Sequence, residues 1–113
     1  MSRRDLITAF RPRKFGRIVG YVETSGAGAW TIDASFNVTS ITDNGVGDFT
    51  INWTNPMNSA NYAVVGCEIT TDPRFLWEDT TTAKSTTVAR FVNHGATSNL
   101  IDPTVGVEIV AVE

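Results

Sequence analysis

Several residue types are scarce in this chain, and each scarcity removes a class of protein. Cys67 is the single cysteine, which excludes an internal disulfide framework. His94 is the single histidine, and with Cys67 it supplies too few ligands for a zinc site. Leucine occurs three times, lysine twice and glutamine not at all, so residues that favour helices are sparse. No apolar run approaches the ~20 residues of a membrane-spanning helix, so we expect no membrane insertion.

Branched side chains are abundant instead. Valine, isoleucine and threonine make up 36 of the 113 residues. These side chains are stiff at χ1 and pack well on the pleated surface of a sheet. A chain of 113 residues is close to the usual size of one domain. The composition therefore predicts a single all-β domain.

Charge is distributed unevenly along the chain. Residues 1–17 contain six basic side chains and one acidic one, whereas residues 18–113 contain three basic and eleven acidic ones. The basic residues of the first segment are Arg3, Arg4, Arg11, Arg13, Lys14 and Arg17. Pro12 disfavours a helix there, and a segment of this composition is expected to become ordered against a negatively charged partner. We therefore divide the chain into a basic attachment arm, residues 1–17, and a folded domain, residues 18–113.

The arm suits an acidic protein surface better than a nucleic acid. Only Phe10 and Phe15 stand among its cations, and the acidic remainder of the chain opposes a duplex. The two phenylalanines are instead candidate apolar anchors. Residues 6–10 are too short for the apolar core of a secretion signal, and an arginine-rich mitochondrial presequence is the alternative left open.

Strand signals recur along residues 18–113, separated by Gly, Asn, Asp or Pro. Phe49, Ile51 and Trp53 alternate with polar residues, which predicts a strand with one apolar face and Trp53 in the core. Phe36 and Val38 are expected to share a face in the same way. The segment 43–47 contains Asn-Gly, which favours a tight hairpin. We predict seven strands, at residues 17–23, 30–34, 35–42, 48–54, 61–71, 84–92 and 105–112.

The strand at 61–71 differs from the others because the run from Tyr62 to Cys67 is apolar on both faces. That pattern indicates burial on both sides, either in the middle of a sandwich or against another subunit. The segments 72–79 and 93–103 are expected to be loops. Together the features predict an antiparallel β-sandwich of jelly-roll-like type.

No set of residues forms a recognisable catalytic motif. A small hydrolase would need His94 with partners such as Ser98 and Asp102, but no nucleophile-elbow sequence accompanies them. The acidic residues at 43–48 lack the spacing of a calcium loop, and the hairpin explains them. We therefore expect no catalytic residues, no metal and no cofactor.

The segment 75–79 holds exposed aromatic candidates. Trp77 either folds back onto the core or a neighbouring subunit, or it forms an exposed contact for a sugar or a protein surface. With the loop at 93–99 it would lie at the far end of the domain from the arm. The candidate surface contacts are Phe75, Trp77, Glu78, Asp79 and His94.

Residues 34–53 read A-S-F-N-V-T-S-I-T-D-N-G-V-G-D-F-T-I-N-W, and after Pro56-Met57 the chain continues with A-N-Y-A-V-V-G at 60–66. This stretch resembles a module of bacteriophage virion proteins that is frequent in tail-fibre proteins. The resemblance implies a non-enzymatic virion surface protein assembled as a homotrimer. No long shaft precedes the module here, which raises the alternative of a capsid decoration or cement protein.

These expectations combine into one functional hypothesis. A phage structural protein, made in the host cytoplasm, would bind capsid or tail proteins through its arm. The docking residues would be Arg3, Arg4, Phe10, Arg11, Arg13, Lys14, Phe15 and Arg17. The alternatives are an adhesin that binds a host surface glycan through Trp77 and, third, a small hydrolase.

Overall fold

The computed structural model describes residues 16–26, 30–70, 74–79, 81–96 and 99–113. Eight strands and no helix occur among them. The described residues therefore contain no helix that could cross a membrane. The strands are β1 (Ile18–Ser25), β2 (Thr31–Phe36), β3 (Val38–Gly45), β4 (Asp48–Trp53), β5 (Ala63–Ile69), β6 (Arg74–Glu78), β7 (Val88–Gly95) and β8 (Gly106–Val112).

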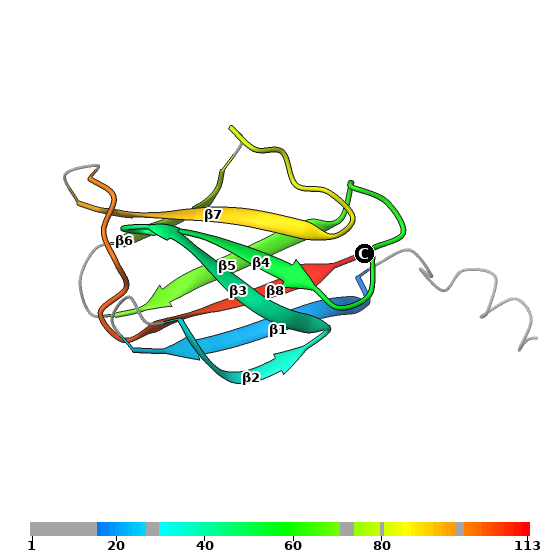
Figure 1. Ribbon diagram of the computed structural model, residues 1–113, viewed down its shortest axis with the longest axis horizontal. Coiled ribbons are helices and arrows are strands. Elements are labelled where there is room, and N and C mark those ends of the chain that lie inside the picture. Colours follow the sequence, from blue (N-terminus) through cyan, green and yellow to red (C-terminus); the bar gives the residue numbers. More distant parts are fainter. Residues whose placement is uncertain (1–15, 27–29, 71–73, 80, 97–98) are drawn as a thin grey trace, which may run out of the picture.

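The strands form two antiparallel sheets of four (Figure 1). Sheet A has the order β2-β1-β8-β5, and sheet B has the order β3-β4-β7-β6. In Figure 1, β2 and β1 lie at the bottom and β7 at the top. The all-β prediction is confirmed, and a sandwich-like arrangement fits the two sheets. β1 begins at Ile18, directly after the segment assigned to the arm.

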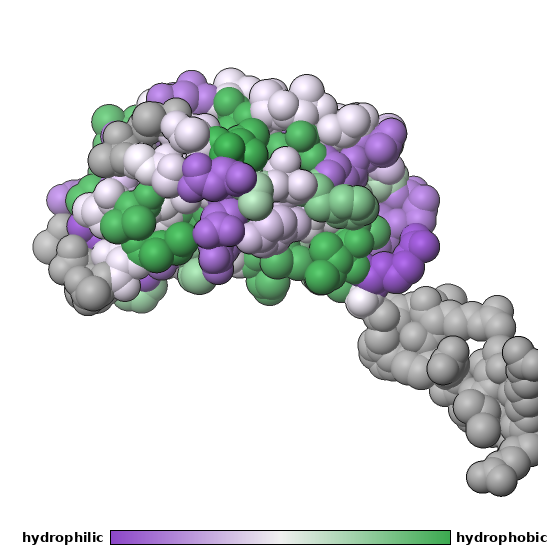
Figure 2. Space-filling view, turned by 90° about the horizontal axis from the view of Figure 1, so that it is seen from below, coloured by the Kyte–Doolittle hydropathy of each residue, from purple (hydrophilic) through white to green (hydrophobic). Residues whose placement is uncertain are grey.

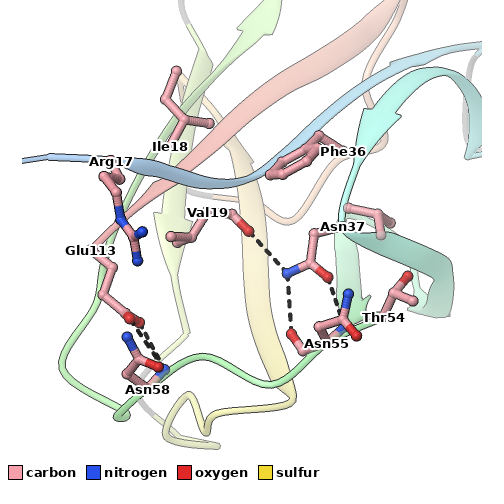
Figure 3. Close-up of a pocket in the computed structure, with 10 residues that line it drawn as sticks. Arg17, Ile18, Val19, Phe36, Asn37, Thr54, Asn55, Asn58 and Glu113 are labelled. Atoms are coloured by element: carbon pink, nitrogen blue, oxygen red, sulfur yellow. Dashed lines mark hydrogen bonds between the residues drawn. The ribbon is translucent and has the colours of Figure 1, made fainter.

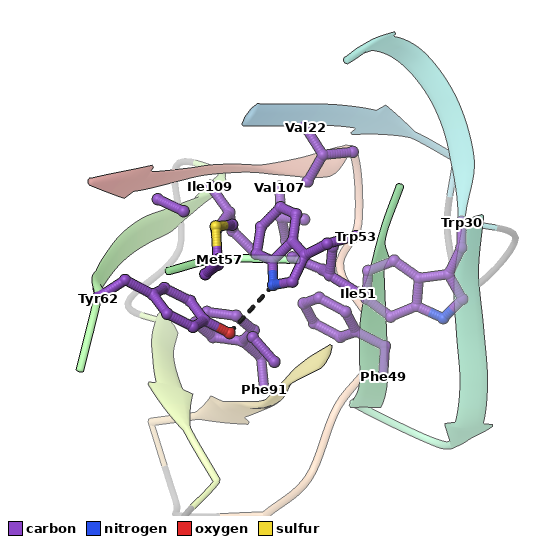
Figure 4. Close-up of a cluster of buried hydrophobic side chains, with 12 residues drawn as sticks. Val22, Trp30, Phe49, Ile51, Trp53, Met57, Tyr62, Phe91, Val107 and Ile109 are labelled. Carbon is purple, nitrogen blue, oxygen red and sulfur yellow. Dashed lines mark hydrogen bonds between the residues drawn. The ribbon is translucent and has the colours of Figure 1, made fainter. Parts of the chain in front are cut away.

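Alternate residues of both sheets form the core (Figure 4). In β4, Phe49, Ile51 and Trp53 are buried while the residues between them are only partly covered, as the period of two predicted. Trp53 is 5% exposed, which confirms it as a core residue. The Trp30 and Phe49 rings lie 4.1 Å apart. The buried apolar residues are Val22, Trp30, Phe49, Ile51, Trp53, Met57, Tyr62, Ala89, Phe91, Val107, Ile109 and Ala111.

The predicted hairpin is present between β3 and β4. Gly45 and Gly47 have φ values of +130° and +64°, which side chains with a Cβ seldom adopt. The Gly45 N–H donates to Asp43 Oδ1 (3.0 Å), and the Gly47 N–H donates to Asp102 Oδ1 (2.8 Å). The polar residues of this segment therefore shape the turn and fix it to the chain before β8.

The predicted strand at 35–42 is interrupted at Asn37. This residue has φ of +60°, and the chain passes there from β2 in sheet A to β3 in sheet B. Its side-chain amide donates to the Val19 carbonyl (2.9 Å) and the Asn55 carbonyl (3.1 Å), which holds the corner. Phe36 and Val38 therefore belong to different sheets, and the prediction that they share a face is wrong.

Three further expectations need correction. The segment 74–78, expected to be a loop, is the edge strand β6, so eight strands replace the predicted seven. The segment 93–95, also expected to be a loop, continues β7, and His94 pairs there with Phe75. β5 is the edge strand of sheet A, and Val65 on it is 63% exposed, so β5 does not lie in the middle of the sandwich.

Candidate binding surfaces

The outer face of sheet B carries an aromatic cluster. Phe75 and Trp77 alternate along β6 and project to the same side, with 48% and 51% of their surfaces exposed. Their ring centroids lie 6.0 Å apart at an interplanar angle of 26°. The His94 ring, on the neighbouring strand β7, lies 4.5 Å from the Trp77 ring. The structure therefore unites three of the five predicted contact residues, and Trp77 does not fold back onto the core of its own chain.

Glu78 and Asp79, the other two predicted contacts, form ion pairs instead. Lys84 Nζ lies 3.2 Å from Glu78 Oε1, and Arg90 Nε lies 3.2 Å from Asp79 Oδ2. Arg90 also holds Asp48 by two hydrogen bonds, of 2.8 and 2.5 Å. Hydrogen bonding to Arg90 lowers the pKa of Asp48 below its ordinary value, and the same contact raises the pKa of Arg90. These carboxylates are neutralised by cations of the same surface.

Hydroxyl and amide groups cover the same face on β3 and β4. Asn52 Nδ2 donates to Thr42 Oγ1 (2.9 Å), and Asn44 Nδ2 donates to Thr50 Oγ1 (2.7 Å). Thr50 lies opposite Arg90 in the register of β4 and β7. The outer face of sheet B therefore passes from aromatic rings at β6, through the ions around Arg90, to polar groups at β3.

The arm joins the body beside a pocket of ≈480 Å³ (Figure 3). Arg17, the one described residue among the predicted docking residues, lines this pocket. Its backbone exchanges hydrogen bonds of 3.0 and 2.9 Å with Glu113, and the Glu113 carboxylate accepts one from the Asn58 N–H (2.9 Å). The other predicted docking residues, Arg3, Arg4, Phe10, Arg11, Arg13, Lys14 and Phe15, lie outside the described residues. The pocket is thus built around the root of the arm.

A second surface, on the outer face of sheet A, was missed by the sequence analysis. Tyr21 lies opposite both Phe36 and Val110, and Val110 lies opposite Val65, so these four residues form a row across all four strands. We call Phe36, Tyr21, Val110 and Val65 the apolar row. Phe36 is 58% exposed. Figure 2, seen from the side where β1 and β2 lie, shows hydrophobic patches between hydrophilic ones. The row was missed because it unites residues far apart in sequence.

One buried polar network also escaped the sequence analysis. Glu68 of β5 and Arg74 of β6 form an ion pair with Oε2 and Nε 3.5 Å apart, and their side chains are 1% and 12% exposed. Asn93 Nδ2 donates to Glu68 Oε1 (3.0 Å) and to the Ile101 carbonyl (3.1 Å). The network joins the edges of the two sheets, and its carboxylate is hidden from solvent.

The residues considered for hydrolysis have other contacts. His94 packs on Trp77, and the Asp102 carboxylate accepts the hydrogen bond from Gly47 that fixes the hairpin. Ser98 lies outside the described residues. Within the described part of the chain, no three His, Cys, Asp or Glu side chains gather as a metal site.

Comparison of the chain with protein-family models, with curated proteins and with solved structures found no match.

Proposed function

We propose that this protein is a non-enzymatic structural component of a bacteriophage virion. It is a small homotrimeric β module attached to the particle by its basic arm, either in the tail or as a capsid decoration or cement protein. The resemblance of residues 34–66 to tail-fibre modules supports the class. In the structure this segment provides the second half of β2, all of β3 and β4 and the first half of β5, with the corner at Asn37.

The observation that carries the proposal is the apolar row. Val65 and Phe36, at its two ends, are 63% and 58% exposed on a sheet face that no described part of the chain covers. Large contiguous apolar patches on a protein surface mark interaction sites. A structural subunit would use such a surface permanently, as an interface.

Immunoelectron microscopy of purified particles tests the proposal. An antibody against this chain should label particles at a fixed place, on the head for a decoration protein or on the tail for a fibre component. Deleting residues 2–14 should abolish the label while circular dichroism of the purified variant still shows a folded β protein. Unlabelled particles, with the wild-type chain confined to the soluble fraction, would contradict the proposal.

A second candidate, glycan binding, is favoured by the stack of Phe75 and Trp77. Two exposed, nearly parallel rings offer a flat apolar surface to the C–H face of a sugar ring. His94 beside them and the ions around Arg90 supply hydrogen-bonding groups on the same face. Such an arrangement would suit attachment to a host surface glycan.

A glycan array distinguishes this candidate from a purely structural role. Trp77→Ala should abolish any binding, and His94→Ala should reduce it. Val46→Ala is the matched control, because Val46 is a similarly exposed apolar residue (60%) in the β3–β4 hairpin, outside β6 and outside the apolar row. Binding that is absent from the wild type, or unchanged by Trp77→Ala, would remove the candidate. Hydrolysis of an ester or glycoside substrate that His94→Ala abolishes would instead support the hydrolase alternative.

A further inference from the structure

Two glutamates lie beside the apolar row on the outer face of sheet A. Glu23 of β1 and Glu108 of β8 are directly opposite each other in the register. Like charges in this position destabilise a sheet. Glu23 accepts a hydrogen bond from the Tyr21 hydroxyl (2.9 Å), but among the described residues neither glutamate forms an ion pair. A cation placed between the two carboxylates would remove the repulsion.

The chain supplies cations of the required kind in its own arm. An extended segment projects alternate residues to one side, so Arg11, Arg13 and Phe15 would face the same way. Residues two apart in an extended chain are ~7 Å apart. The glutamates lie two residues from the apolar row along the same strands, again ~7 Å away. The ~7 Å between Arg13 and Phe15 therefore matches the ~7 Å between the glutamate pair and the apolar row.

The geometry favours the arm of a neighbouring copy over the chain's own arm. Arg17 is fixed at the start of the sheet by its backbone bonds to Glu113. Glu23 lies six residues further along β1, ~20 Å away, whereas Arg13 is four residues from Arg17 and reaches ~14 Å at most. If the chain's own arm folded back over sheet A, no residues between Arg13 and Arg17 would remain to form the turn. An arm from a second copy starts from a different point, so Phe15 and Arg13 reach this face wherever the second copy's Arg17 lies within ~7 and ~14 Å of their contacts.

We infer that the arm of one copy binds the outer face of sheet A in the next copy. Arg11 and Arg13 would lie against Glu23 and Glu108, and Phe15 would cover part of the apolar row. Head-to-tail contacts of this type form a closed ring when the rotation between copies closes, as it must in a trimer. The inference rests on the proposed function in treating the arm as an attachment segment. It assigns Arg11, Arg13 and Phe15 to a second copy of this chain and leaves the residues before them for contact with the particle.

Cys67 provides a position-specific test in the full-length chain. It is exposed and lies opposite Glu108, beside the glutamate pair. Lys14→Cys adds a second thiol next to Arg13 in the arm, and mild oxidation should then produce disulfide-linked multimers on a non-reducing gel. The control carries Lys14→Cys with Cys67→Ser and Thr42→Cys, which moves the second thiol from sheet A to sheet B. Neither the control nor the wild type should give these multimers. Intramolecular linkage or no linkage would overturn the inference.

A charge exchange tests the contacts themselves. Glu23→Lys with Glu108→Lys should raise the dissociation constant measured by sedimentation by about tenfold or more, because attraction becomes repulsion. Arg11→Glu with Arg13→Glu should do the same. Combining all four substitutions in one chain should restore association. Failure of the fourfold variant to restore it would contradict the contacts.

The apolar part of the interface has its own matched pair. Val65→Ser should weaken association, whereas Val46→Ser should not, since Val46 is similarly exposed (60%) but lies in the hairpin outside sheet A. Equal effects of the two variants would contradict a role for the apolar row.

These outcomes separate the inference from the proposed function. A wild-type chain that is monomeric in sedimentation but still labels particles would refute the inference and the homotrimer, while supporting a structural role on the virion. A chain that associates through its arm but labels no particle would support the inference and refute the proposed function.

Discussion

The indole N–H of Trp53 donates a hydrogen bond of 3.0 Å to the hydroxyl oxygen of Tyr62 inside the sandwich (Figure 4). The hydroxyl in turn donates to the Ser85 carbonyl (2.8 Å) and to the Val88 carbonyl (3.0 Å). This chain of bonds joins β4 to the segment before β5 and to the start of β7. Burial raises the pKa of Tyr62, so the hydroxyl remains a donor throughout the neutral range.

Tyr62→Phe should therefore destabilise the fold. The substitution leaves a buried indole N–H and the carbonyls without this partner, which costs ~1–3 kcal/mol in free energy of unfolding. Urea denaturation followed by tryptophan fluorescence measures it. Tyr21→Phe is the control, since within the described ranges that hydroxyl donates only to Glu23, on the outer face of sheet A. A midpoint equal to the wild type for Tyr62→Phe would show that the bonds contribute nothing net.

The Asp48–Arg90 pair should make stability depend on pH in a defined direction. Because the folded-state pKa of Asp48 lies below its unfolded value, the pair stabilises the fold above pH ~4. This stabilisation is lost as the pH falls through the folded-state pKa. Asp48→Asn should lower the urea midpoint at pH 7, and the difference from the wild type should shrink between pH 4 and pH 2.

Asp33→Asn is the control for that titration, because Asp33 accepts a hydrogen bond from Ser25 and forms no ion pair among the described residues. Its midpoint should differ little from the wild type at either pH. A constant difference between Asp48→Asn and the wild type across the pH range would contradict the electrostatic explanation.

Gly20 should not tolerate a methyl group. A Cβ there would lie 2.5 Å from the Trp53 ring, which is itself buried. Gly20→Ala should cost ~1–3 kcal/mol by overpacking. Gly95→Ala is the matched strand glycine, whose Cβ would meet its nearest neighbour at 3.5 Å. Thermal unfolding of both should show a clear loss for Gly20→Ala alone, and similar losses would mean that strand position, not the contact with Trp53, decides the cost.

Asn37 should stabilise the fold in two separable ways, through its positive φ and through its side-chain hydrogen bonds. Asn37→Gly keeps the positive φ and loses the side-chain hydrogen bonds, whereas Asn37→Ala loses both. The alanine variant should be less stable than the glycine variant by ~1–2 kcal/mol, the cost of a left-handed conformation. Chemical denaturation of the pair measures that difference directly, and equal stabilities would indicate that the corner relaxes.

Local patterns predicted the parts of the fold that depend on neighbours in sequence. The alternation from Phe49 to Trp53 identified β4 and its buried face, and Asn44-Gly45 identified the hairpin. The strand β6 was missed because Phe75, Leu76 and Trp77 are consecutive large apolar residues without alternation. An edge strand that exposes its aromatic residues reverses the usual rule that apolar faces are buried.

The candidate surfaces were predicted less completely than the fold. Phe75, Trp77 and His94 were identified individually, but their stacking depends on the register of β6 and β7. The apolar row and the Glu23–Glu108 pair depend on β1 pairing with β8 at the other end of the chain. The sequence contains no local signal for such distant pairings, since each strand is compatible with several registers.

The backbone bonds between Arg17 and Glu113 also have a mechanical consequence. Pulling on the arm transmits tension straight into β1, which is bonded along one edge to β2 and along the other to β8. When the force runs along β1, the hydrogen bonds that join it to β2 and to β8 must break together instead of one after another. A module tethered in this way resists detachment of its own first strand, so rupture under load should begin at the contact outside the domain.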